Sequence, residues 1–134
     1  MKITRRWLLE NEACREAVYY LIFNNLIGMD AIELLQKLKD TRPDFCVWGI
    51  GVCTNITILR QAIIIFDINS HDGLWRTPLM WACIYNHLKT AKFLLEHGAD
   101  VDRVDCAGAT ALRWAKNNQN KKLITLLKKH GAKS

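Results

Sequence analysis

Proline and serine are scarce in this chain of 134 residues, with two of each, at Pro43, Pro78, Ser70 and Ser134. Flexible or stiff linkers are commonly rich in these residues, and no such stretch precedes Asp72. We therefore expect residues 1–71 to pack directly onto the rest of the chain. Neither serine lies in a Gly-x-Ser-x-Gly motif, so the sequence offers no serine nucleophile of the hydrolase type.

The chain also lacks a long apolar run. Its most apolar window, Ile56–Ile68, is interrupted by Arg60 and Asp67 and falls short of the roughly 20 residues that a transmembrane helix needs. The basic N-terminus is followed by a stretch that Glu10 and Glu12 break, so we expect no secretion signal and no membrane partner.

Paired cysteine motifs and phosphate-binding loops are missing as well. The five cysteines form no paired framework, which favours free thiols in a reducing compartment and predicts a cytoplasmic protein. Cys46 and Cys53 lie seven residues apart, but no Cys-x-x-Cys or His-x-x-x-His pair completes a zinc site. Gly49-x-Gly51 lacks the third glycine of a dinucleotide loop. We predict no catalytic residue, no cofactor and no metal. An unrecognised enzyme using Cys46, Cys53 or His71 stays open as an alternative.

What the sequence does contain is a repeat with a period of 33 residues. The stretch from Asp72 to Ala82 returns in altered form from Asp105 to Ala115, and His97-Gly98-Ala99 returns as His130-Gly131-Ala132. A period of this length with a Thr-Pro-Leu opening is typical of a turn followed by two helices.

Local signals predict where the first of these helices begins and ends. The Thr77 hydroxyl can cap it, and Pro78 suits the first helical position because its missing N–H has no partner to lose. Asn86 tolerates the left-handed conformation that ends a helix. The apolar face between them consists of Leu79, Ala82 and Cys83.

A second helix follows, and then a loop. Residues 88–95 are more thoroughly apolar, and Gly98 stands just beyond them, where a C-terminal cap glycine is expected. Residues 99–105 alternate apolar and acidic side chains and precede Gly108, which predicts a protruding hairpin-like loop.

These motifs resemble the ankyrin repeat family, whose consensus runs Asp-x-x-Gly-x-Thr-Pro-Leu-His-x-Ala, then a Gly-His turn, then Leu-Leu-x-x-Gly-Ala-Asp. The resemblance covers residues 72–134 and implies an all-α, ankyrin-type helical solenoid with two repeats, 72–104 and 105–134. Several positions depart from the consensus. Trp75 replaces the turn glycine, Asn86 and Gln119 replace the inter-helix glycine, Met80 and Arg113 replace the histidine, and Ala111 replaces the proline.

Two repeats bury their apolar faces only against neighbours, so something upstream must cover the first one. We expect residues 1–71 to form a helical N-terminal cap. Helices are predicted over Leu8–Asn24, over residues 31–38 with Asp30 as the cap, and after Pro43. Periodicity leaves Ile56–Ile68 open between a fourth helix and a strand.

Trp48, Trp81 and Trp114 share the 33-residue interval, each followed by a small residue. This spacing suggests a degenerate repeat at residues 44–71. The alternative is coincidence among five tryptophans.

The charge is uneven along the chain. Residues 1–68 hold eight bases and eight acids, so the whole net charge of +6 lies downstream. No acid follows Asp105, while the bases there are Arg113, Lys116, Lys121, Lys122, Lys128, Lys129 and Lys133. Such a surface would attract an acidic protein or a nucleic-acid backbone. The alternative is a terminal helix whose lysines only keep it solvated.

The resemblance implies a non-enzymatic protein-interaction module, acting as a small adaptor, inhibitor or regulatory subunit. In ankyrin proteins the hairpin tips and the exposed side of the inner helices form a concave recognition surface. By position, this surface comprises Leu74, Trp75, Arg76, Ile84, Tyr85, Arg103, Cys106, Ala107, Ala109, Asn117 and Asn118. For the large apolar members Leu74, Trp75, Ile84 and Tyr85, packing against the N-terminal helices is the alternative. Binding of nucleic acid or an anionic surface by the basic second repeat is the alternative function. The oligomeric state is left open.

Overall fold

The computed structural model describes residues 2–4, 6, 10, 30–40, 42–53 and 55–133. In this part of the chain the helices are α3 (Ala31–Leu38), α4 (Pro43–Val52), α5 (Ile56–Ile65), α6 (Pro78–Ile84), α7 (Leu88–Glu96), α8 (Ala111–Asn117) and α9 (Lys121–Lys129). The described residues form no strand beyond an isolated bridge between Lys2 and Asp30. The all-α prediction is confirmed, while the helix predicted for Leu8–Asn24 falls, apart from Glu10, outside the described residues.

The first repeat folds as its local signals predict. The Met80 amide donates to the Thr77 hydroxyl over 3.3 Å, which caps α6, and Pro78 is the first helical residue. Asn86 adopts a positive φ of 59° between α6 and α7, and Gly98 adopts 93° after α7.

The second repeat uses the same devices at equivalent positions. The Arg113 amide donates to the Thr110 hydroxyl over 3.3 Å at the start of α8. Gln119 takes the left-handed turn with φ 53°, and Gly131 ends α9 with φ 93°. Asn86 and Gln119 therefore adopt the left-handed backbone conformation of the glycine that they replace in the consensus.

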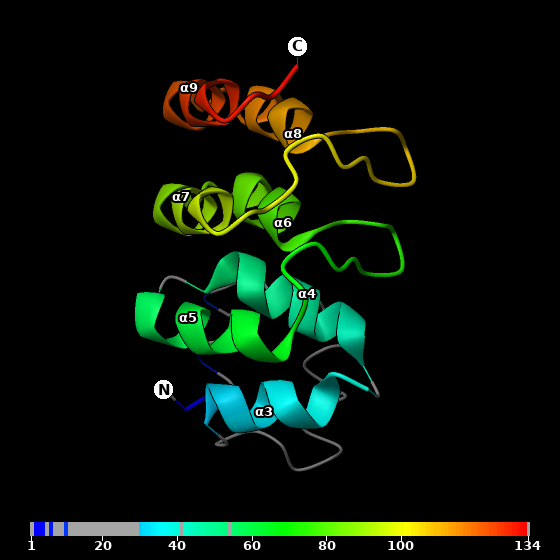
Figure 1. Cartoon of the computed structure of the whole chain (residues 1–134), viewed down its shortest axis with the longest axis vertical. Coiled ribbons are helices and arrows are strands. Elements are labelled where there is room, and N and C mark those ends of the chain that lie inside the picture. Colours follow the sequence, from blue (N-terminus) through cyan, green and yellow to red (C-terminus); the bar gives the residue numbers. More distant parts are fainter. Residues whose placement is uncertain are drawn as a thin grey trace.

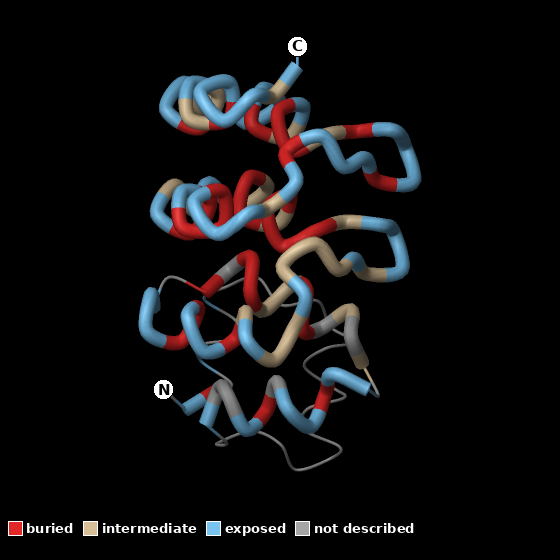
Figure 2. Tube along the Cα trace, viewed as in Figure 1, coloured by how far each residue is buried: buried red, intermediate tan, exposed pale blue. Residues whose placement is uncertain are grey.

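The helix pairs stack as layers, with their hairpin loops projecting on the same side (Figure 1). Buried residues concentrate where one layer faces the next, whereas the loop tips are exposed (Figure 2). Leu79 and Leu94 of the first repeat and Leu112 and Leu127 of the second are almost fully buried. This continuous core across repeats is what makes the chain a solenoid.

The N-terminal helices continue the stack. α4 packs against α6, and the approach is close because Gly51 has no side chain. A Cβ at Gly51 would overlap the Cβ of Trp81 and lie 2.6 Å from the Pro78 carbonyl oxygen. The buried Thr90 hydroxyl donates to the Cys53 carbonyl over 2.6 Å, which ties α7 to the end of α4.

Of the segment Ile56–Ile68, for which helix and strand were both open, residues Ile56–Ile65 form the helix α5, and the last three residues lie beyond its end. The Asn55 side chain accepts from the amides of Thr57 and Ile58, over 3.0 and 3.2 Å, and so starts α5. α3 packs against both α4 and α5.

The degenerate repeat at residues 44–71 stays a prediction. α4 and α5 supply two helices in the right order, and α4 runs in the same direction as α6 (Figure 1). However, α4 has 10 residues where α6 has 7, and Trp48 has Lys39 nine residues before it where Trp81 and Trp114 have aspartates.

Candidate functional site

An aspartate fixes the first hairpin, residues 72–77. Asp72 Oδ1 accepts from the amides of Leu74 and Arg76, each over 2.9 Å, and Oδ2 accepts from the Trp81 indole over 3.0 Å. The Asp72 amide donates back to the Arg76 carbonyl over 3.0 Å. One side chain thus holds both the loop and the helix that follows it.

The second hairpin, residues 105–110, repeats this arrangement. Asp105 Oδ1 accepts from the amides of Ala107 and Ala109, each over 2.9 Å, and Oδ2 accepts from the Trp114 indole over 3.2 Å. Burial favours a raised pKa for Asp105, which is only 4% exposed, but these three donors and the charge of Arg76 outweigh it. The net effect is a lowered pKa, so the carboxylate is the stable form.

The two hairpins are joined to each other. The Cys106 amide donates to the Leu74 carbonyl over 3.0 Å. The Arg76 guanidinium lies over the rings of Trp81 and Trp114, 5.1 and 5.2 Å from their centres, which links the repeats by cation–π contact. The two loops therefore form one rigid edge.

The tips of the two hairpins differ in size and polarity. Leu74 and Trp75 are 49% and 58% exposed on the first, whereas Ala107 and Gly108 occupy the second. Trp75 has φ 60° and Gly108 has φ 75°. A left-handed backbone suits glycine and is an outlier for a bulky aromatic, so the first hairpin keeps an exposed tryptophan in a strained position.

The structure separates the predicted surface residues into exposed and structural ones. Ala109 is 6% exposed, and its amide is held by Asp105, so it presents no side chain to a partner. Arg76 is half-buried between the two indoles. The exposed members of the set are Leu74, Trp75, Arg103, Cys106, Ala107, Asn117 and Asn118.

At the ends of the inner helices, two predicted residues have structural contacts. The Asn118 amide donates to the carbonyls of Cys83 and Ile84, over 2.9 and 2.8 Å, which joins the two repeats. Tyr85 stacks on Trp81, with ring centres 5.8 Å apart. Ile84 and Tyr85 are both half-buried.

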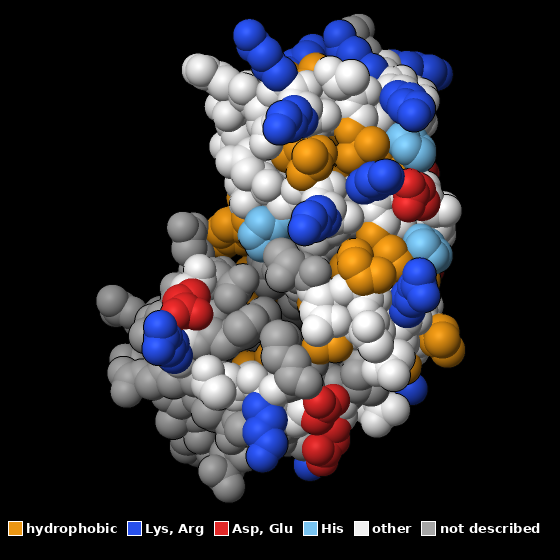
Figure 3. All heavy atoms as spheres, turned by 90° about the vertical axis from the view of Figure 1, so that its left-hand side faces the viewer, with side chains coloured by type: hydrophobic (Ala, Val, Ile, Leu, Met, Phe, Trp, Pro, Cys, Tyr) orange, Lys and Arg blue, Asp and Glu red, His pale blue; other side chains and the backbone are white. Residues whose placement is uncertain are grey.

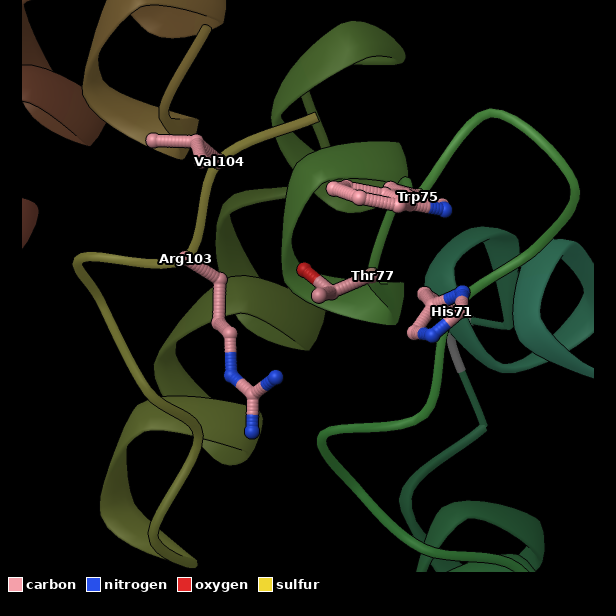
Figure 4. Close-up of a pocket in the computed structure, with 5 residues that line it drawn as sticks. All are labelled: His71, Trp75, Thr77, Arg103 and Val104. Carbon is pink, nitrogen blue, oxygen red and sulfur yellow. The ribbon is translucent and has the colours of Figure 1, made fainter. Parts of the chain in front are cut away.

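A pocket of about 190 Å³ lies between the first hairpin and the segment Arg103–Val104, which leads into the second hairpin. His71, Trp75, Thr77, Arg103 and Val104 line it (Figure 4). Trp75 and Val104 lie along one edge, Arg103 and His71 on the other, and Thr77 between them (Figure 4). No residue of the inner helices α6 and α8 lines it.

Two of the five lining residues, Trp75 and Arg103, were predicted to bind a partner. Val104 was missed because the alternation over residues 99–105 does not tell which valine faces outward. Val101 is buried and Val104 exposed. His71 was considered only for catalysis, and Thr77 only as a helix cap.

Features for catalysis are not gathered among the described residues. Cys46 and Cys53 are buried, and burial raises the pKa of both thiols, that of Cys46 to about 12. A protonated thiol is a poor nucleophile. Within the described ranges, no group of three or more His, Cys, Asp or Glu side chains is placed to hold a metal. In the same ranges, no helix has the length and hydropathy to cross a membrane.

The basic end of the chain is solvent-exposed. All seven bases that follow Asp105 are exposed. Lys and Arg side chains gather at the upper end of the face shown in Figure 3, over α9.

Comparison with known proteins identifies the repeats. A family model described as ankyrin repeats in three copies matches residues 49–134, more than half of the chain. The chain is 41% identical over 61 residues to human ankyrin repeat domain-containing protein 13B, covering 46% of this chain and 10% of that protein. It is 46% identical over 61 residues to mouse ankyrin repeat and SOCS box protein 12, covering 43% and 20%. It is 36% identical over 61 residues to the putative ankyrin repeat protein FPV223 of fowlpox virus, covering 46% and 43%.

The chain thus spans less than half the length of each of these relatives. Ankyrin repeats generally mediate protein–protein interaction and are generally non-enzymatic. The matched stretch, the stacked helix pairs and the loop geometry that the two repeats share agree, and this chain belongs to the ankyrin repeat family.

Proposed function

We propose that this chain is a non-enzymatic protein-interaction module that acts as a small adaptor, inhibitor or regulatory subunit. Its contact surface is the concave side formed by the hairpins and the inner helices. The observation that carries the proposal is the exposed Leu74–Trp75 tip, which keeps a strained tryptophan where the second repeat has glycine.

An exposed tryptophan on a rigid loop is well suited to binding. Aromatic anchors contribute a large share of interface energy, and a loop that is already ordered loses little entropy when it binds. Asp72 and the Cys106–Leu74 hydrogen bond supply that order. The strain supports a binding role, because the fold itself would be better served by glycine at position 75.

The test is capture of a partner by the intact chain, followed by affinity measurement with the purified pair. The variant Leu74→Ala/Trp75→Gly copies the Ala107–Gly108 tip and keeps the turn. Ile64→Ser is the matched control, because Ile64 is an exposed apolar residue on α5, away from the hairpins. We expect a purified partner to bind the intact chain and the control equally, and the double variant about tenfold more weakly or worse. A partner that binds all three proteins equally would place the contact elsewhere.

A second candidate function has its own observation. The second repeat carries seven exposed bases after its only acid, Asp105. We propose that these bases bind an acidic surface of a partner protein, with a nucleic-acid backbone as the alternative. Charge of one sign steers such partners over several ångströms.

Salt dependence distinguishes the two. The affinity of the chain for an unrelated DNA duplex can be measured by fluorescence anisotropy at about 50 and 200 mM salt. If the chain contacted six or more phosphates, this affinity would fall by a factor of about 10³ or more between the two concentrations. We expect no measurable duplex binding at either salt concentration. Tight, salt-sensitive binding of unrelated duplexes would favour the nucleic-acid alternative.

We also propose a reducing compartment, the cytoplasm, as the place of action. Cys53, Cys83 and Cys106 are free thiols, and Cys106 is exposed at the second hairpin. Maleimide labelling in intact cells should find Cys106 reduced. A stable disulfide at this position would contradict the assignment.

A further inference from the structure

We infer that the pocket between the hairpins receives one apolar side chain of a partner protein, with a carboxylate of that partner next to it. The inference rests on the proposed protein-binding function and adds a position and a chemistry to it. It places this contact on a part of the hairpins that the inner helices do not line.

The size of the pocket selects the kind of occupant. Sites for small molecules and cofactors usually measure about 300–1,000 Å³. At about 190 Å³ this pocket is smaller than that range. A single side chain from a larger partner, anchored from outside, fits the space better than a complete small molecule.

The walls of the pocket select the chemistry. Trp75 and Val104 are both large, apolar and about half exposed, and together they make one edge that an apolar side chain would cover. The opposite edge carries Arg103 and His71 (Figure 4). A ligand that matches the pocket therefore has an apolar group for the first edge and a polar group beside it for the second.

Arg103 supplies the preference for a carboxylate. Its Nε lies 3.4 Å from Asp100 Oδ2, and both side chains are about half exposed, so this surface pair is weak. A guanidinium has five N–H donors in a planar fork that matches a carboxylate, and the pair with Asp100 engages one nitrogen. A partner carboxylate can therefore bind to the terminal nitrogens without breaking the pair.

The pocket is held open by the fold. Asn69 Oδ1 accepts from the Asp100 amide over 2.7 Å, and Asn69 Nδ2 donates to the Gly98 carbonyl over 3.4 Å, so the two arms that carry His71 and Arg103 are bound together. On the other side, the Leu74 carbonyl is held by the Cys106 amide. Walls that are fixed before binding lower its entropic cost.

A second copy of this chain is a poorer occupant than an unrelated acidic partner. Each copy carries a net charge of +6, so two copies repel each other at low salt. A partner with a carboxylate at the contact is attracted instead.

The inference can be tested without knowing the partner, by NMR titration of the isotope-labelled full chain. The probes are N-acetyl-L-phenylalanine, which has an apolar ring next to a carboxylate, and N-acetyl-L-phenylalaninamide, which lacks the charge. We expect both to shift the Trp75 indole and Val104 methyl signals, with the acid binding about two- to fivefold more tightly, the usual range for one half-exposed ion pair.

Variants assign the two edges. Arg103→Gln should make the acid and the amide bind alike, whereas Arg113→Gln, an exposed arginine on α8, should leave the difference unchanged. Trp75→Gly should abolish binding of both probes. Val104→Thr, which leaves the turn untouched, should weaken binding of both and guards against a change of fold in the tryptophan variant.

Three results would overturn the inference. They are equal binding of acid and amide to the intact chain, shifts confined to residues outside the pocket, and probe binding that is as tight in Trp75→Gly and Val104→Thr as in the intact chain. None of these depends on the partner capture described above. If capture fails while the probes bind as expected, the proposed function fails and the pocket stands. If a partner is captured but the probes fail, the reverse holds.

Discussion

The first and second hairpins have one framework and two different tips. In each, an aspartate accepts from two loop amides and from an indole nine residues later. The framework then presents Leu74–Trp75 in one case and Ala107–Gly108 in the other. The comparison indicates that the aspartate framework serves the fold, whereas the residues at the tip can vary and can serve binding.

The charges of the two repeats differ in the same sense. The first repeat, residues 72–104, has four bases and four acids, while the second has seven bases and one acid. We therefore expect apolar contact with a partner mainly on the first repeat, and long-range attraction of an acidic partner mainly by the second.

The largest expected effect comes from removing an aspartate of the framework. Asp105→Ala leaves two amides and the Trp114 indole without their acceptor in a buried place, and should lower the free energy of unfolding by about 3 kcal/mol. Asp72→Ala should lower it by about 1.5 kcal/mol, because Asp72 is less buried. Urea unfolding of both variants checks the order. A larger loss of unfolding free energy for Asp72→Ala than for Asp105→Ala would mean that the two aspartates do not play equivalent roles.

The same aspartate gives the fold a pH dependence. The folded state lowers the pKa of Asp105, so its carboxylate stabilises the fold above the ordinary aspartate pKa. That contribution should be lost as the pH falls below about 4 and through the lower folded-state pKa. Thermal unfolding between pH 7 and 3 should show the loss, and Asp105→Asn should show a smaller one. Identical acid profiles for the two proteins would contradict this role.

The next effect concerns the junction with the N-terminal helices. Gly51→Ala would place a Cβ against Trp81 and the Pro78 carbonyl and should destabilise the fold by about 2 kcal/mol. Gly49→Ala is the matched control on the same helix, where a Cβ meets nothing within 4 Å, and should stabilise by about 0.5–1 kcal/mol. Chemical denaturation of the two variants measures the difference. Equal effects would mean that α4 does not stack on the first repeat, which would also weaken the prediction of a degenerate repeat at 44–71.

A smaller effect is expected at the tips themselves. Trp75→Gly should raise the free energy of unfolding by about 1 kcal/mol, because it relieves a left-handed aromatic residue. Gly108→Trp should lower it by about the same amount, since a Cβ there meets no atom within 4 Å and only the backbone strain is added. Both are measured by thermal and chemical unfolding. A loss of stability in Trp75→Gly would show that the tryptophan serves packing.

The smallest effect on stability is expected from the lysines of the second repeat. Lys121→Gln/Lys122→Gln changes two exposed residues and should alter the free energy of unfolding by less than about 0.5 kcal/mol. Association with an acidic partner should nevertheless slow at low salt. Stopped-flow association rates check this, and an unchanged rate would reduce these lysines to solubilising residues.

The helix boundaries of the repeats could be predicted from the sequence because their causes are local. Thr77, Pro78, Asn86 and Gly98 each act within one turn of chain, and the structure has them in the expected roles. Periodicity alone left Ile56–Ile68 open between helix and strand, and the Asn55 cap that starts α5 was not among the predicted caps.

The surface was harder to predict because its causes are tertiary. Arg76 and Asn118 were predicted from their positions to bind a partner, and this stays a prediction. The sequence did not indicate that both also join the repeats, Asn118 by donating to the carbonyls of Cys83 and Ile84 and Arg76 by lying over the rings of Trp81 and Trp114. Ala109 is buried, and its amide donates to Asp105 Oδ1. The pocket forms because His71 on one loop and Arg103 on the next line the same space, which no sequence spacing reveals.

The central claim is that the first tip trades stability for binding. It is tested most directly by measuring, on the same Leu74→Ala/Trp75→Gly protein, its free energy of unfolding and its affinity for a purified partner. The account predicts that stability rises by about 1 kcal/mol while affinity falls about tenfold or more. Unchanged affinity, or stability and affinity that fall together, would contradict it.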